Sequence, residues 1–180
     1  VNSGTSVYGI GPERLRQRGT TAHNTVVVDS KDSSEVWSGF RVARRAKPQD
    51  LSVRQESAGW IISCAHDGYR RLKGRPLHRR SWDFGEGCLT VYDIIEGDHR
   101  HAEAMFHFHP DLTPALGEGN RSGTLTLDGE TIMHWRVDKG TPRLEQSTWH
   151  PEFGVTLKTR RLAIELESGE SSIEFYWTSP

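Results

Sequence analysis

The sequence lacks long apolar runs. None of its apolar stretches approaches the roughly 18 residues of a membrane-spanning helix, which excludes such a span among these 180 residues. Hydrophobic residues make up only 34% of the chain, and the mean hydropathy is -0.65. No signal peptide is present, but the chain starts without methionine in what reads as mid-strand, so this absence says nothing about export.

Cysteine is also scarce. Cys64 and Cys88 both lie in strand-like runs, where buried free thiols are the default and a single disulfide stays possible. Two cysteines therefore leave the redox compartment open. Internal repeats, low-complexity tracts and obvious linkers are absent too, and a chain of this length corresponds to one domain, residues 1–180.

Charge is nearly balanced overall but unevenly distributed. The net charge is -1, yet residues 41–80 hold eleven Arg and Lys against three Asp and Glu, a net charge of +8. Most of these cations are arginines, which bind carboxylate and sulfate through a bidentate fork. Since no recognition helix, RNA-binding aromatic pair or zinc finger is found, an acidic polysaccharide fits better than nucleic acid. The alternative is a solvated sheet face that the acidic residues of the second half balance.

What the sequence does contain is alternation. Apolar and polar residues alternate through most of the chain. Asp-Gly, Glu-Gly and Ser-Gly pairs, which are typical of turns, separate the alternating segments. Such a pattern predicts an all-β fold, an antiparallel β-sandwich or stacked sheets of about a dozen strands. The predicted strands are 25–29, 39–45, 51–56, 59–66, 77–84, 88–96, 100–108, 123–127, 131–137, 143–148, 155–166 and 172–177. A short helix is expected at 12–17, and 77–84 with 88–96 is expected to form a hairpin.

One run of residues stands out for chemistry. Residues 21–29 read as a turn carrying His23, then an apolar β-branched strand that ends in Asp29. A histidine held rigidly before a buried strand suits a metal ligand or a catalytic group. Alternatively, His23 only hydrogen bonds a loop carbonyl at the start of the strand.

The longer string around His23 resembles the heparinase II/III-like family of polysaccharide lyases. The resemblance lies in residues 18–29 (RGTTAHNTVVVD) with 34–37 (SEVW), and it starts at 1–9 (VNSGTSVYG). It continues through 40–46, 66–69, 78–80 and 106–110 and fades in the last third, where only 151–154 (PEFG) looks familiar. The family combines an N-terminal α/α toroid with stacked β-sheets, and this chain matches the β part.

The resemblance implies a fragment of a lyase that cleaves an acidic, uronate-containing glycan by β-elimination. It also implies a periplasmic or extracytoplasmic location and a toroid domain of the same chain that carries most proton-transfer residues, so the fragment alone is expected to be inactive. In the family a zinc ion is held by two histidines and an aspartate. Here the matching positions are His23 and Asn2, and the third ligand would lie upstream. Because an amide is a poor zinc ligand, this fragment is expected to bind zinc weakly or not at all.

Further candidate residues come from strand patterns. His78 and Arg80 share one face of a predicted strand, and with Tyr69 they are the catalytic candidates: Arg80 would neutralise the uronate carboxylate and His78 would assist. The alternative is that His78 and Arg80 form a structural pair. His107 and His109 are expected to project side by side from a polar, sugar-facing strand, or from a solvated one. The predicted substrate-binding residues are Arg41, Arg44, Arg45, Arg75, Trp37, His107 and His109, and Trp37 is the tryptophan expected to be most exposed.

Three functions remain open at this point. The first is the β-domain of a polysaccharide lyase. The second is a non-catalytic module that binds an anionic glycan or has a structural role. The third is a stand-alone metalloenzyme that uses His107 and His109.

Overall fold

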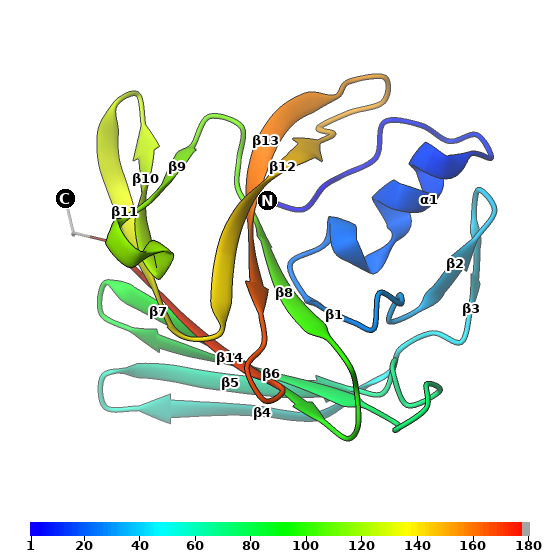
Figure 1. Cartoon of the computed structure of the whole chain (residues 1–180), viewed down its shortest axis with the longest axis horizontal. Coiled ribbons are helices and arrows are strands. Elements are labelled where there is room, and N and C mark those ends of the chain that lie inside the picture. The colour runs from blue at the N-terminus through cyan, green and yellow to red at the C-terminus, as the bar shows by residue number, and fades with distance from the viewer. Residues whose placement is uncertain (178–180) are drawn as a thin grey trace.

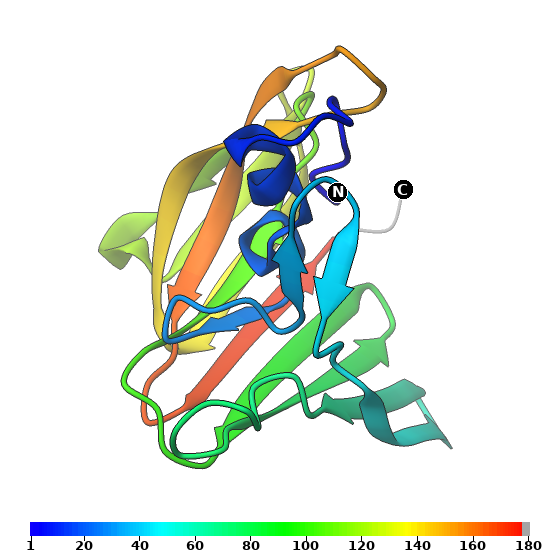
Figure 2. The same cartoon turned by 90° about the vertical axis from the view of Figure 1, so that its right-hand side faces the viewer.

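Two antiparallel β-sheets face each other, and a short helix covers the outer side of the smaller one (Figures 1 and 2). The computed structural model describes residues 1–177. The large sheet contains, in spatial order, β4 (Pro48–Glu56), β5 (Gly59–His66), β6 (Leu77–Gly85), β7 (Cys88–Glu96), β14 (Glu170–Tyr176), β11 (Glu130–Lys139), β10 (Ser122–Leu127) and β9 (Thr113–Leu116). The small sheet contains β1 (Val26–Val28), β8 (Ala102–His107), β13 (Leu157–Glu165) and β12 (Thr141–Trp149). The remaining elements are α1 (Pro12–Arg18), the ribbon of β2 (Glu35–Trp37) and β3 (Arg41–Ala43), and the 3-10 turns η1 (Thr20–Ala22) and η2 (Glu118–Asn120).

The two sheets differ in how their faces are covered. In β7 of the large sheet burial alternates: Val91, Asp93 and Ile95 are buried, whereas the residues between them are exposed. The large sheet thus buries one face here, as is usual for antiparallel sheets. In β1 all three valines are buried, because the small sheet is covered on both sides.

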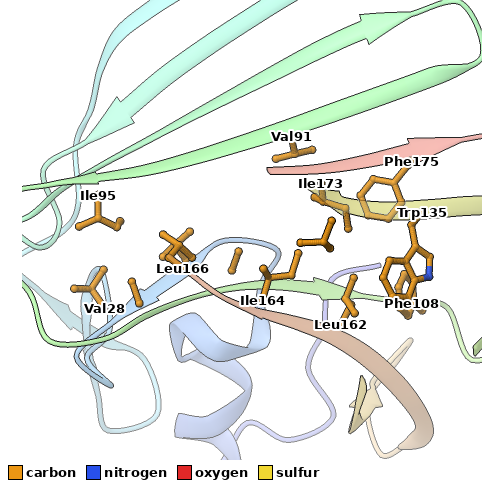
Figure 3. Packing of buried hydrophobic residues seen from close by; sticks show 14 of the residues in the cluster. Val28, Val91, Ile95, Phe108, Trp135, Leu162, Ile164, Leu166, Ile173 and Phe175 are labelled. Atoms are coloured by element: carbon orange, nitrogen blue, oxygen red, sulfur yellow. The ribbon is translucent and has the colours of Figure 1, made fainter. Parts of the chain in front are cut away.

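The main core lies between the sheets. Figure 3 shows Val28, Leu162 and Ile164 of the small sheet pointing toward Val91 and Ile95 of the large one. On the other face of the small sheet, Val27, Met105 and Ala163 form a second, smaller cluster. Helix α1 lies on that side (Figure 3).

Trp135 is the largest fully buried side chain, and its neighbour on β10 has to be a glycine. Gly123 pairs with Trp135 across β10 and β11. A Cβ at position 123 would overlap both the Trp135 ring and the Ala115 carbonyl oxygen. The glycine therefore allows the indole to lie flat on the strand at the end of the core.

The predicted all-β sandwich is confirmed. Each of the twelve expected strands is found, 59–66 and 88–96 with the predicted ends and the others with shifted ends, and the helix predicted at 12–17 is α1. The predicted hairpin of β6 and β7 forms. Because β6 extends to Gly85, which pairs with Cys88, only Glu86 and Gly87 remain in the turn, and Gly87 has a left-handed φ of 68°. Cys64 and Cys88 are free thiols.

Two short strands were not predicted, β2 and β9, and the strand expected at 39–45 shortens to β3. Strand β9 contains Pro114, which argues against a central strand but is tolerated at a sheet edge, where β9 lies. Among residues 1–177, no helix is long and apolar enough to cross a membrane.

Candidate functional site

His23 and Asn2 lie in direct contact. The Nδ1 atom of His23 is 2.6 Å from the Oδ1 atom of Asn2, and since an amide oxygen only accepts, the imidazole donates. His23 follows η1, and its backbone N–H donates to the Thr20 carbonyl. Burial lowers the pKa of His23, although a backbone hydrogen bond with Arg18 and the charge of Asp32 act in the opposite direction.

The first residues of the chain are fixed beside His23 by backbone hydrogen bonds. Ser3 donates to the Ala22 carbonyl at 3.1 Å, and His150 donates to the Ser3 carbonyl at 2.7 Å. The side chain of Asn24 donates to the Val1 carbonyl at 2.9 Å and accepts from the His107 backbone at 2.7 Å. Within the Ala-His-Asn sequence, Asn24 therefore links the first residue of the chain to β8, and His23 donates a hydrogen bond to Asn2.

These residues do not fit a complete zinc shell. Structural zinc sites have four protein ligands and catalytic ones have three, drawn from His, Cys, Asp and Glu. No group of three such residues that could hold a metal is found in residues 1–177. Asn2 and His23 supply one amide oxygen and one imidazole, so no chemical step is assigned to a metal here.

Strands β5, β6 and β7 of the large sheet place a buried polar network beside the Ala-His-Asn sequence. His78 and Arg80 lie on one face of β6, as predicted, and are 3% and 6% exposed. Arg80 donates from Nε to Asp93 Oδ1 at 2.7 Å and from Nη2 to Oδ2 at 2.9 Å. His78 approaches the same carboxylate with Nε2, at 2.7 Å from Oδ1. Asp93, which is 1% exposed, thus binds two of the three catalytic candidates.

Asp93 is ionised in this network. Burial by itself raises the pKa of Asp93, but the Arg80 charge and the hydrogen bonds from His78 and Arg80 hold it well below its usual range. The guanidinium and the carboxylate neutralise each other, so neither has a free charge for a uronate.

Arg80 also joins the two sheets. Its Nη1 atom donates to the Asn24 carbonyl at 2.6 Å, and its guanidinium lies 5.3 Å from the ring centroid of Phe106 on β8. Arg80 and Trp82 line two cavities of about 200 and 430 Å³, and Asn24 contributes to both. The smaller cavity also contacts His66 and His78, and the larger one contacts His107 and His109. The open edge of the sandwich next to the Ala-His-Asn sequence is therefore the candidate site.

Tyr69 is fully buried rather than placed in an accessible loop. Its hydroxyl donates to the Val26 carbonyl at 2.6 Å, and burial raises its pKa well above the ordinary value. The buried hydrogen bond holds the Tyr69 hydroxyl against β1 and keeps it protonated. Its predicted catalytic role, like those of His78 and Arg80, stays a prediction.

The expectation that His107 and His109 project side by side from an exposed strand face is wrong, whereas their role in substrate binding stays a prediction. His107 is only 5% exposed, because both faces of β8 are covered, and its ring contacts the Thr21 carbonyl and the Ser147 hydroxyl. Burial and the charge of Arg161 lower the pKa of His107 to about 4. His109 lies beyond the end of β8, 3.4 Å from the Asp111 carboxylate, with its ring 4.6 Å from that of Trp149. The two imidazoles therefore do not project as a pair.

The predicted arginine and tryptophan contacts come from separate elements. Trp37 is 47% exposed, the most exposed of the described tryptophans as predicted, and the Arg41 guanidinium stacks 4.7 Å above its ring. Arg44 pairs with Glu35 at 2.9 Å on the same ribbon. Arg45 is exposed just after β3, whereas Arg75 is exposed on the loop between β5 and β6. Trp37, Arg41 and Arg44 thus share one ribbon and Arg75 lies elsewhere, and their role in substrate binding stays a prediction.

Sequence reasoning missed Asp93 and His66. The signal for Asp93 was present, since it occupies the buried phase of an alternating strand between Val91 and Ile95. His66 pairs with His78 across β5 and β6, so both imidazoles belong to one network. Recognising either residue required the register of the strands.

Comparisons with known proteins place this fold. The family model "Heparinase II/III-like, C-terminal" matches residues 1–178. A search of curated proteins finds no match. Among solved structures, a mutant of heparan sulfate lyase HepC from Pedobacter heparinus aligns with a TM-score of 0.73 at 15% identity, over 99% of this chain and 29% of that one.

Similar values hold for a heparinase III with methylated lysines, which aligns with a TM-score of 0.74 at 16% identity, over 99% of this chain and 28% of that one. At such identities the likeness shows the fold, and the chain spans less than a third of the length of these structures. On the family match across its whole described length, the chain belongs to the heparinase II/III-like family as a C-terminal domain.

Proposed function

We propose that this β-sandwich forms one wall of the substrate cleft in a polysaccharide lyase that acts on an acidic, uronate-containing glycan. The observation that carries the proposal is the family match over residues 1–178. The similar solved structures, a heparan sulfate lyase and a heparinase III, support the substrate class.

β-Elimination on a uronate makes three chemical demands. The carboxylate must be neutralised, the C5 proton must be removed, and the O4 leaving group must be protonated. In the described residues, His78 and Arg80 are committed to Asp93, and Tyr69 is committed to Val26. We therefore assign proton transfer to a helical toroid domain of the same protein. The sandwich supplies a rigid wall at the open edge beside Asn24 and Arg80.

The experiment compares the 180-residue chain with the longer protein that contains the toroid. Both are incubated with heparin, heparan sulfate, alginate and hyaluronan, and unsaturated uronate is followed by ultraviolet absorbance. We expect product from the longer protein on at least one substrate and none from the chain. Product from the chain alone would overturn the division of roles and return attention to His78, Arg80 and Tyr69.

A second candidate is a module that binds an anionic glycan without turnover. The observation that favours it is the exposed Trp37 with Arg41 stacked on its ring, a pairing that can contact both a sugar face and its acidic group. Binding by a longer protein that produces no unsaturated uronate would select this alternative.

A further inference from the structure

We propose that a cavity at the far end of the small sheet is a second binding site, which holds a carboxylate or sulfate group of an acidic saccharide. The inference rests on the proposed function, because it names where the glycan's acid groups bind. Three loops form this loop-end cavity: residues 29–31 after β1, 72–74 before β6, and 98–101 before β8. Its volume is about 630 Å³, within the usual range of ligand pockets.

The loop-end cavity is separate from the candidate site beside His23. Strands β1 and β8 run antiparallel between the two places, with Val28 paired to Ala102 at the cavity end. His107, at the other end of β8, contacts the candidate site. Six residues of strand correspond to roughly 20 Å. A glycan chain that contacts both places must therefore span several sugar units.

The loops are tied to one another, which fixes the cavity in shape. Asp29 donates its backbone N–H to the His101 carbonyl, and its Oδ1 accepts from the backbone N–H groups of Arg100 and His101 at 2.8 and 3.0 Å. The Asp98 backbone donates to the Gly74 carbonyl at 3.2 Å. Gly74 has a φ of 86°, and a Cβ there would overlap the Asp98 carbonyl. Such preorganisation lowers the entropy cost of binding.

Cations without partners line the cavity. Lys31, Lys73 and Arg100 are exposed, and none forms an ion pair with residues 1–177. Other arginines of the large sheet are paired: Arg79 binds Asp50 and Glu96, and Arg136 binds Asp138 and Glu174.

The carboxylates that face these cations are Asp29 and Asp98. Three cations therefore face two carboxylates, a net charge of +1, and Asp29 already accepts two backbone hydrogen bonds. The imidazoles of His99 and His101 add further nitrogen atoms for hydrogen bonding. The carboxylates of Glu103 on β8 and Glu165 on β13 each lie 3.4 Å from a ring nitrogen of His101. A tetrahedral sulfate or a planar carboxylate fits such a set of donors.

The test measures affinity by calorimetry with the 180-residue chain and three probes: a sulfated heparin oligosaccharide, an unsulfated hyaluronan oligosaccharide and a neutral maltooligosaccharide. The variant is Lys31→Ala/Lys73→Ala/Arg100→Ala. The matched control, Lys47→Ala/Arg54→Ala/Lys158→Ala, also removes two lysines and one arginine from exposed positions outside the cavity. Thermal unfolding checks that both variants stay folded.

We expect the cavity variant to weaken binding of an acidic probe at least tenfold and the control to change it less than twofold. Binding of only the heparin probe assigns a sulfate group, and equal binding of both acidic probes assigns a carboxylate; both results support the site. Equal loss in the two variants, unchanged affinity in the cavity variant, equal binding of the neutral probe, or no binding of either acidic probe overturns it. The lyase assay of the longer protein is independent of these outcomes, so the inference can fail while the proposed function stands.

Discussion

His78 and Asp93 share a hydrogen bond of 2.7 Å although both side chains are almost completely buried. This bond ends a series of hydrogen bonds that runs from Gly68 through His66 and His78 to Asp93, and the direction of each can be assigned. The Gly68 N–H donates to His66 Nδ1, so the neutral His66 ring carries its proton on Nε2. His66 Nε2 lies 3.1 Å from His78 Nδ1, which must accept, and His78 therefore donates from Nε2 to Asp93. The Arg80 guanidinium is the cation that balances Asp93.

We expect Asp93→Asn to destabilise the domain by about 3–5 kcal/mol, because the substitution leaves the Arg80 charge buried without a partner. Urea unfolding followed by fluorescence measures the loss. Asp83→Asn is the matched control, since Asp83 lies on the neighbouring strand β6, on the face opposite to that of Arg80, and should change stability by less than about 0.5 kcal/mol. Equal effects of the two substitutions would show that the buried pair contributes nothing specific.

Stability should fall as the pH is lowered from about 6.5 to about 4. Burial lowers the pKa of His66 to about 4, and burial with the charge of Arg161 does the same for His107. Since an unfolded histidine titrates near 6.5, the unfolded chain binds more protons than the folded chain between these values. The contribution is complete above pH 6.5 and lost as the pH falls to 4.

The measurement is the free energy of unfolding at pH 7, 5.5 and 4.5 in wild type, His66→Gln and His107→Gln. In each variant the free energy of unfolding should fall less steeply with decreasing pH than in the wild type, because the variant lacks one of the two titrating histidines. Three parallel curves would contradict the assignment.

The core prediction concerns Gly123. We expect Gly123→Ala to lower the free energy of unfolding by about 1–3 kcal/mol, because the added methyl group would overlap the Trp135 ring and the Ala115 carbonyl oxygen. Gly9→Ala is the control, since nothing lies within 4 Å of a Cβ there. Thermal unfolding of the two variants should separate them clearly, and a Gly123→Ala protein as stable as the control would mean that the strand shifts at little cost.

The sequence predicts the strands well and the site poorly, and the reason is physical. Strands such as β6 and β7 follow from local alternation and from the turn at Gly87, which neighbouring residues determine. The Asp93–Arg80 pair depends on strand register, and the burial of His107 depends on Thr21, which is 86 residues away in sequence. The contact of Asn2 with His23 was expected only from family resemblance, because residue spacing carries no information about it.

Tyr69→Phe separates a structural role from a catalytic one. Removing the hydroxyl leaves the Val26 carbonyl without its buried donor, so we expect a loss of about 1–3 kcal/mol in stability. In the longer protein, kcat and KM per folded molecule should stay unchanged, because the ring is fully buried. A large fall in kcat with little change in stability would make Tyr69 a catalytic residue.

The last prediction concerns the charge beside His23. In the wild type, burial lowers the pKa of this histidine, and its partner Asn2 is neutral. Asn2→Asp places a carboxylate at hydrogen-bond distance from Nδ1, which favours the imidazolium. We therefore expect the pKa of His23 to rise by at least about one unit, followed by NMR titration of its ring protons.

The same substitution should strengthen Zn²⁺ binding, because a carboxylate is a far better ligand than an amide. Asn2→Ala is the control: it removes the hydrogen bond without adding charge and should neither raise the pKa nor improve Zn²⁺ affinity. Calorimetric titration with Zn²⁺ should rank Asn2→Asp above wild type and Asn2→Ala. Even in Asn2→Asp, two protein ligands fall short of the three or four of a zinc site, so binding should stay weak. Tight Zn²⁺ binding by the wild type, abolished in His23→Ala, would show that residues of this chain complete the shell in a way that the described geometry does not provide.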